Sequence, residues 1–175
     1  MPRMATTVRD RRTVVLSGAL AGLMVLTGCS GDEPTDEETT VTTSPMEPEE
    51  ARETAAALLE DAQASLEGAF GDLSWEDSTP AGEKPSDAGC RITLPTRRCD
   101  VYLGRESADH ERIAIALSEA LESHALPAAP TPTGGTGGWL TTSSTGDGIT
   151  LSFRAKGFSE LTVHVDVAQA CADIH

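Results

Sequence analysis

The chain has 175 residues, a formal net charge of −15 and 3% aromatic residues. This length fits one domain of ordinary size with a short extension, and it excludes two large domains. Such an acidic surface repels phosphate backbones, so the composition excludes nucleic acid as a partner, and the few aromatic rings argue against a large lipid-binding or sugar-stacking cavity.

The first 28 residues have the pattern of an export signal. Four arginines and one aspartate precede residues 13–26, an apolar stretch that contains no charged residue. A basic start followed by an apolar stretch of this length is typical of a secretory signal peptide, whereas a membrane-spanning helix needs about 20 apolar residues. We therefore predict that residues 1–28 are a signal peptide.

The apolar stretch ends in Leu26-Thr27-Gly28-Cys29, which resembles the lipobox of bacterial lipoproteins. The resemblance covers residues 1–29. It implies cleavage before Cys29, attachment of a diacylglycerol to the Cys29 sulfur, and a location on the outer face of the cell membrane. Processing would remove four of the 13 basic and one of the 28 acidic residues, which leaves 9 and 27 and a net charge of −18. Two or more acyl chains hold a protein stably on a membrane.

The segment after the lipobox has the composition of a tether. Residues 30–43 read SGDEPTDEETTVTT, which is acidic, rich in threonine and almost without large apolar side chains. Such a segment cannot bury enough surface to fold, so we predict a disordered tether over residues 29–43. A flexible coil of this length spans on the order of 20 Å. The folded domain is then expected at residues 44–175.

The domain is predicted to begin with a helix. Ser44 is a good N-cap, Pro45 suits the first helical position, and Glu47 can complete a capping box. Gly68 and Gly71 are expected to end the helix. Apolar residues recur at steps of three and four, which indicates one buried face: Ala51, Ala55, Leu58, Ala62, Leu66.

A short strand at Leu73–Glu76 and a loop over residues 77–89 are expected next, because the loop contains several prolines and glycines. Two further candidate strands lie near residues 90–94 and 98–103. Ser107 is predicted to cap a second helix, which Pro127 stops. One face of this helix carries Ile113, Ala116, Leu117, Ala120, Leu121 and His124.

The last third of the chain is predicted to form an antiparallel meander that begins at Trp139–Ser143. Residues 149–156 and 161–167 both alternate apolar and polar side chains, which is typical of strands with one dry and one wet face. The predicted order is α-β-(β)-α-β-β-β. Two helices on one face of a mostly antiparallel sheet would bury both helical stripes, so the predicted fold class is α+β with two layers. The arrangement resembles that of small lipoproteins from high-GC Gram-positive bacteria.

Cys90, Cys99 and Cys171 remain once Cys29 carries lipid, and in an oxidising compartment two of the three are expected to form a disulfide. Cys90–Cys171 is the favoured pairing. Cys171 follows the last strand and continues the every-second-residue alternation of that strand's buried side chains. Cys90–Cys99 and Cys99–Cys171 remain open alternatives, since geometry decides between them. The remaining cysteine is expected to be a buried, inert thiol.

Few residues have the spacing of a catalytic or metal site. His164 and Asp166 share the wet face of one strand, which could seed an acid–base or metal pair, but a solvated sheet face is the main expectation. The glycine-rich stretch 134–138 lacks the residues of a phosphate-binding loop, so a flexible loop is expected. A local basic cluster is expected mainly to balance acidic neighbours: Arg91, Arg97, Arg98 and Arg105.

We therefore assign no catalytic residue, no metal ligand and no cofactor from the sequence. The expected function is that of a non-enzymatic, lipid-anchored module that binds or supports another envelope component, with an envelope protein as the candidate partner. A carrier of a small ligand or lipid is the alternative, and a small enzyme that uses His164 and Asp166 is a third candidate. The sequence leaves the oligomeric state open.

Overall fold

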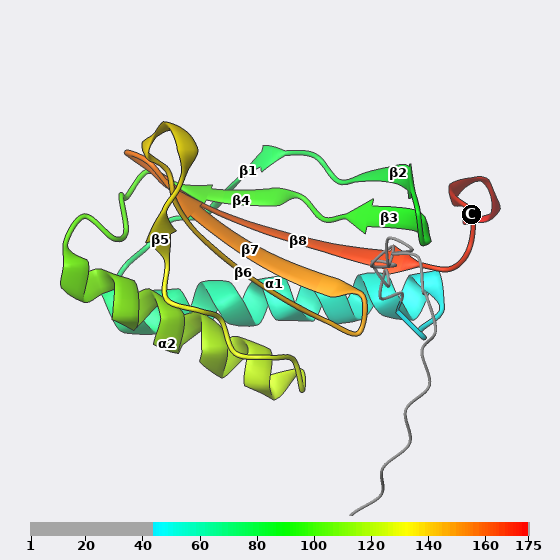
Figure 1. Ribbon diagram of the computed structural model, residues 1–175, viewed down its shortest axis with the longest axis horizontal. Coiled ribbons are helices and arrows are strands. Elements are labelled where there is room, and N and C mark those ends of the chain that lie inside the picture. The colour runs from blue at the N-terminus through cyan, green and yellow to red at the C-terminus, as the bar shows by residue number, and fades with distance from the viewer. Residues whose placement is uncertain (1–43, 175) are drawn as a thin grey trace, which may run out of the picture. The chain divides into compact units, whose positions relative to one another are not determined.

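The computed structural model describes residues 44–174. The predicted signal peptide, the lipidation site Cys29 and the predicted tether lie outside the described residues. Two α-helices and one sheet make up the described part (Figure 1). Helix α1 spans Pro48–Phe70 and helix α2 spans Ser107–Ser123. Neither is long and apolar enough to cross a membrane.

The sheet has eight strands, all paired antiparallel, in the order β1-β4-β8-β7-β6-β5, with β2 paired to β3 and β3 also paired to β8. The long strand β8 therefore lies in the middle and pairs with β3 and β4 on one side and β7 on the other. The bounds are β1 Glu76–Thr79, β2 Gly82–Ser86, β3 Gly89–Thr93, β4 Thr96–Cys99, β5 Thr133–Gly134, β6 Leu140–Gly146, β7 Ile149–Ala155 and β8 Ser159–Val167.

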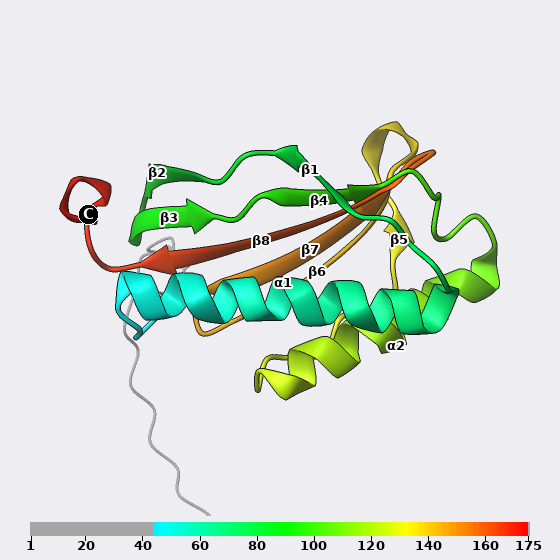
Figure 2. The same cartoon turned by 180° about the vertical axis from the view of Figure 1, so that it is seen from behind.

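Both helices lie on the same side of the sheet, and α1 runs along β8 (Figures 1 and 2). The core lies between these two layers, where the predicted helical stripes meet the apolar side chains of β7 and β8. The predicted α+β class with two helices on one antiparallel sheet is therefore confirmed. The largest fully buried side chains include Leu58, Leu66, Ile113, Leu117, Leu121, Leu151, Phe153, Leu161, Val163, Val165 and Val167.

Helix α1 begins three residues later than the predicted N-cap Ser44 implies. Its N-cap is Glu47, and Pro48 takes the first helical position in place of Pro45. Ser44 instead forms a bridge to β8, where its backbone N–H donates to the carbonyl of Asp166 at 2.8 Å. The predicted Ser44–Glu47 capping box is thus wrong, because the sheet uses the backbone of Ser44. The helix also continues through Gly68 and ends at Phe70.

Helix α2 also begins one residue from the prediction. Ser107 is the first helical residue, and Glu106 is the N-cap. A capping box joins Glu106 to Asp109, because each side chain accepts a hydrogen bond from the backbone N–H of the other residue. At the far end of the helix, the half-buried His124 contacts Asp61 of α1, with 2.8 Å between Nε2 and Oδ2.

The edge of the sheet differs most from the predictions. The expected loop 77–89 contains most of β1 and all of β2, and the expected strand at Leu73–Glu76 is irregular up to residue 75. Prolines fit because β1 and β2 form an edge, where a missing N–H costs no ladder bond. The expected strand near 98–103 is β4, which ends at Cys99, and bends and turns follow it.

The meander of β6, β7 and β8 confirms the predicted alternation. Leu151 pairs with Val163 and Phe153 with Leu161 on the core side, while Ser152 pairs with Thr162 on the other. The two strands therefore present one apolar and one polar face, as their sequences indicate.

A disulfide joins Cys90 of β3 to Cys171, which follows β8. This is the pairing that the sequence analysis favoured, and Cys99 remains as a buried thiol. Gly89 allows the backbone of β3 to lie close to the end of β8. Its φ is +134°, and a Cβ there would lie 2.5 Å from the carbonyl oxygen of Val167. Burial raises the pKa of the Cys99 thiol, so it is a poor nucleophile at neutral pH.

Candidate functional site

The face of the sheet that the helices leave uncovered, here called the open face, is polar. Its side chains come from the outward positions of β6, β7 and β8, as the cross-strand register shows. Most are hydroxyl groups, and a few are charged or titratable: Thr141, Ser143, Thr145, Thr150, Ser152, Arg154, Glu160, Thr162, His164, Asp166. Hydroxyl groups can both donate and accept hydrogen bonds.

A groove of about 650 Å³ lies over β6 and β7, beside residues 130–133. The hydroxyl of Thr142 donates to the carbonyl of Pro130 at 2.6 Å, which holds this neighbouring segment against the sheet. The groove is mainly hydroxyl-lined, and one of its lining residues is charged: Pro130, Thr131, Thr133, Thr141, Thr142, Ser143, Ser152, Phe153, Arg154, Thr162.

Arg154 is that charged residue, and two neighbours fix its position. Its Nε donates to Oε2 of Glu160 at 2.5 Å, and the Glu160 side chain is only 7% exposed. Its Cζ atom lies 4.9 Å from the ring centroid of Trp139. Within residues 44–174, Nη1 and Nη2 of Arg154 make no hydrogen bond. The guanidinium is thus held in place with donors left for a ligand.

Trp139 and Phe158 connect this arginine to a second one. The two rings meet edge to face with centroids 5.5 Å apart, and Cζ of Arg98 lies 3.9 Å from the centroid of Phe158. We call Arg98, Trp139, Arg154 and Phe158 the cation–aromatic cluster. Its members come from β4, β7, the turn before β8 and the residue before β6, so contacts between distant segments build it.

The glycine-rich stretch 134–138 lies next to this cluster and is partly ordered. It begins at the end of β5, and residues 136–138 form a turn in which Gly137 has a left-handed φ of +74°. The ammonium group of Lys156 donates to the carbonyl of Gly137 at 2.6 Å. The stretch is therefore a turn that one hydrogen bond ties to the sheet, and its flexibility stays a prediction.

His164 and Asp166 lie on the open face, but Asp166 is paired with arginine. Nε and Nη2 of Arg91 donate to its two carboxylate oxygens at 2.9 and 2.6 Å. This hydrogen bonding lowers the pKa of Asp166. Burial lowers the pKa of the half-buried His164, and the charge of Arg91 lowers it further. The two residues therefore hold a neutral imidazole and an ionised carboxylate at neutral pH.

The lowered pKa of His164 should appear in the pH dependence of stability. A group with a lowered folded-state pKa is protonated more readily in the unfolded chain, so stability is retained above the unfolded pKa of 6.5 and falls below it. We expect the free energy of unfolding of His164→Gln to fall less between about pH 7 and pH 5 than that of the wild type. Urea unfolding at both pH values measures this, and equal decreases for both proteins would contradict it.

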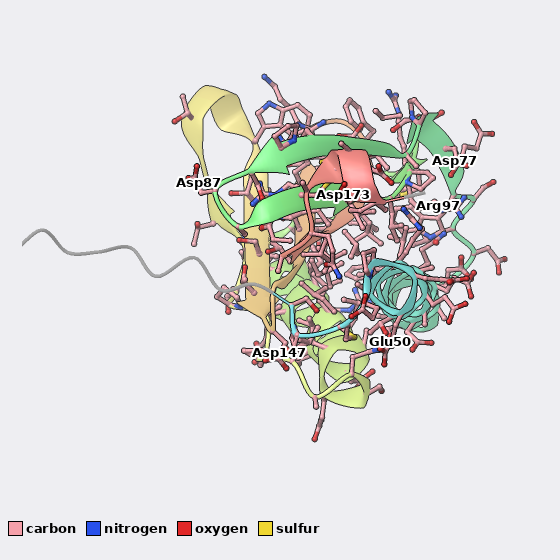
Figure 3. The ribbon with its side chains drawn as sticks, turned by 90° about the vertical axis from the view of Figure 1, so that its right-hand side faces the viewer. Glu50, Asp77, Asp87, Arg97, Asp147 and Asp173 are labelled. Atoms are coloured by element: carbon pink, nitrogen blue, oxygen red, sulfur yellow. A yellow bond between two sulfur atoms is a disulfide. The ribbon has the colours of Figure 1, made fainter. Side chains whose placement is uncertain are left out.

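Two other members of the basic cluster pair with acidic neighbours. Arg97 pairs with Asp77 across β4 and β1 at 2.5 Å, and the two residues are labelled in Figure 3. Arg98 pairs with the exposed Asp100 at 3.1 Å. Arg105 is exposed. Among the described residues, no three His, Cys, Asp or Glu side chains are grouped to hold a metal ion.

The comparisons with known proteins bear on the fold. No family model matches the chain, and no curated protein matches it. Among solved structures, the chain is similar to that of "the putative lipoprotein LppA from Mycobacterium tuberculosis", with a TM-score of 0.51 and 15% identity over 67% of this chain and 75% of that one. At this identity the likeness concerns the fold alone.

Proposed function

We propose that this chain is a lipid-anchored protein of the outer face of the cell membrane and acts there as a non-enzymatic module that binds another envelope component. The hydroxyl-lined groove on the open face carries the proposal. It is a recess lined mostly by serine and threonine residues, on a sheet whose other face is used for the core. The lipobox at Leu26-Thr27-Gly28-Cys29 and the fold shared with LppA support the anchor.

The position of Ser44 supports this function. Ser44 enters the fold beside Val167 at the end of β8, whereas Thr162 in the groove lies five residues earlier on the same strand. At the usual rise of a strand, the groove is thus on the order of 16 Å from the point where the chain enters. A partner could reach the groove while an anchor at Cys29 holds the other end.

The charge at the end of the fold where Ser44 enters supports a domain that stands away from the membrane. Glu50, Asp87, Asp147 and Asp173 surround the end of the fold where α1 begins and β8 finishes (Figure 3). Carboxylates at this end would be repelled by anionic lipid head groups, and so would the acidic tether. The domain would therefore stand away from the membrane surface and leave the groove accessible.

Crosslinking from the groove in intact cells tests this function. We expect a photoreactive amino acid at the exposed position Ser143 to yield one recurrent crosslinked species. The same amino acid at Glu122, an exposed position on α2, is the matched control and should yield no such species. Mass spectrometry of the purified adducts identifies what was captured.

A second control concerns the anchor. Cys29→Ala should release the protein from the membrane fraction and reduce the Ser143 crosslink, because the local concentration of an envelope partner falls. Identical mixtures of neighbours from Ser143 and Glu122 would refute the module, and an unchanged membrane fraction for Cys29→Ala would refute the anchor.

A further inference from the structure

We propose that the groove binds a polysaccharide that carries carboxylate groups, and that Arg154 binds the carboxylate. This inference rests on the proposed function and names the chemistry of the partner. Four observations carry it: the free donors of Arg154, the hydroxyl groups of the lining, the charge of the surroundings and the rings beside the guanidinium.

The geometry of Arg154 suits a carboxylate. A guanidinium binds a carboxylate best through two parallel N–H donors, and side-chain entropy is lost unless the group is already held in place. The contact of Nε with the buried Glu160 and the Trp139 ring hold the group. Neither Nη atom makes a hydrogen bond within residues 44–174, and 56% of the arginine side chain is exposed beside the groove.

The lining of the groove suits a sugar more than an apolar peptide. Seven of its ten lining residues bear a hydroxyl group: Thr131, Thr133, Thr141, Thr142, Ser143, Ser152, Thr162. Hydroxyl groups exchange donor and acceptor roles readily, which matches the hydroxyl groups of a sugar ring. Protein interfaces depend instead on apolar and aromatic anchors that fill desolvated pockets.

The charge distribution restricts where an anionic chain could bind. The protein has a net charge of −15, so its surface as a whole repels polyanions. The groove differs because its one charged lining residue is Arg154, which pairs with Glu160 through Nε and presents its Nη donors. Arg98, which pairs with Asp100, lies in the adjoining cation–aromatic cluster. Electrostatic complementarity would therefore direct a carboxylate to this place and keep the chain off the rest of the surface.

The few aromatic residues do not contradict a sugar ligand. Trp139 and Phe158 are two of six aromatic residues in the chain, and both lie in this cluster. They position the two arginines, so the groove would recognise a sugar through guanidinium and hydroxyl hydrogen bonds. A deep stacking cavity, which the composition argues against, is not required.

Calorimetric titration of the full protein, purified from membranes in detergent, tests the proposal. The probes are hexagalacturonate, which carries six carboxylates, its methyl ester, and neutral maltohexaose. We expect hexagalacturonate to bind at least about tenfold more tightly than either neutral probe, because only the acid can pair with the guanidinium. Rising salt should weaken the binding of hexagalacturonate.

Two pairs of variants locate the binding. Ser143→Asp places a competing carboxylate in the groove and should weaken the binding of hexagalacturonate at least about tenfold, whereas the neutral Ser143→Asn, which changes the same side chain without adding charge, should weaken it much less. Arg154→Gln should have the effect of Ser143→Asp, and Arg112→Gln, an exposed arginine on α2, should have none. Ser143 is exposed, and its hydroxyl makes no hydrogen bond in the part of the chain that the structure describes, so Ser143→Asp keeps the test valid if loss of Arg154 unfolds the protein.

Absence of hexagalacturonate binding, equal affinity for its methyl ester, or full affinity in Ser143→Asp would each overturn the proposal. The crosslinking experiment separates this failure from failure of the proposed function. A protein captured at Ser143 but not at Glu122, without glycan binding, would refute the polysaccharide ligand and leave the proposed module intact. Absence of both the crosslink and the glycan binding would refute both proposals.

Discussion

Replacing both Cys90 and Cys171 with alanine is expected to lower the free energy of unfolding by about 4.5 kcal/mol. The two residues are 81 positions apart, so the disulfide closes a long loop and removes much of the entropy of the unfolded chain. A loss of this size is a large fraction of the stability of an ordinary domain. The variant should unfold at a much lower denaturant concentration than the wild type.

Guanidinium unfolding monitored by circular dichroism measures this difference, with reduced wild-type protein as a second test of the same bond. Cys99→Ser is the control, because this thiol is buried but makes no covalent bond. It should retain the disulfide and therefore most of the stability. A loss below about 1 kcal/mol in the double variant would show that the loop is already restricted in the unfolded chain.

Leu117→Ala should have the second largest effect, a loss of about 3 kcal/mol in the free energy of unfolding. Leu117 lies in the core between α2 and the sheet and is 1% exposed, so its truncation leaves a cavity. Ile115 is on the same helix, two residues away, and is 53% exposed. Ile115→Ala removes the same number of carbon atoms from a solvated position, and we expect a change within about 0.5 kcal/mol.

Thermal and denaturant unfolding of the two variants give the comparison directly. Because helix propensity favours alanine at both positions, the difference between the variants isolates burial. Similar losses for both would mean that Ile115 is covered in the protein in solution. Its neighbours Ala69, Arg112 and Glu119 line a shallow recess between the helices, so such a result would locate a contact there.

The periodic spacing of apolar residues predicts most of the fold. The stripe from Ala51 to Leu66 and the alternation over residues 149–167 each bury one face against the other, so local pattern and tertiary packing agree. The α+β class could therefore be predicted from the sequence. The position of Cys171 after β8, in phase with its buried residues, likewise indicated the partner of Cys90.

The errors lie where tertiary contacts override local signals. Ser44 has the chemistry of an N-cap, but its backbone pairs with β8, and the next suitable proline, Pro48, begins the helix. The prolines of residues 77–89 indicate a loop, yet an edge strand tolerates Pro85 because one side of that strand needs no partner. Neither competing contact can be read from neighbouring residues.

Most of the candidate site cannot be predicted from the sequence. The alternation of the last strands predicts a solvated face and points only to His164 and Asp166, whereas Asp166 pairs with Arg91 from β3. The groove and the contact of Arg154 with Trp139 depend on the register of β6, β7 and β8, which alternation alone does not fix. The one available signal was the pairing of opposite charges at Arg154 and Glu160 across a short turn.

The bridge between Ser44 and β8 gives the domain a mechanical property. If the protein is anchored through Cys29 and holds a polymer in its groove, tension enters the fold at Ser44 and leaves it near Arg154. The backbone bond of Ser44 passes this load to β8, which three other strands flank, and the Cys90–Cys171 disulfide locks the chain just beyond it. The fold would then resist pulling along its most strongly connected strand, as expected for a protein that links a membrane to a polymer outside it.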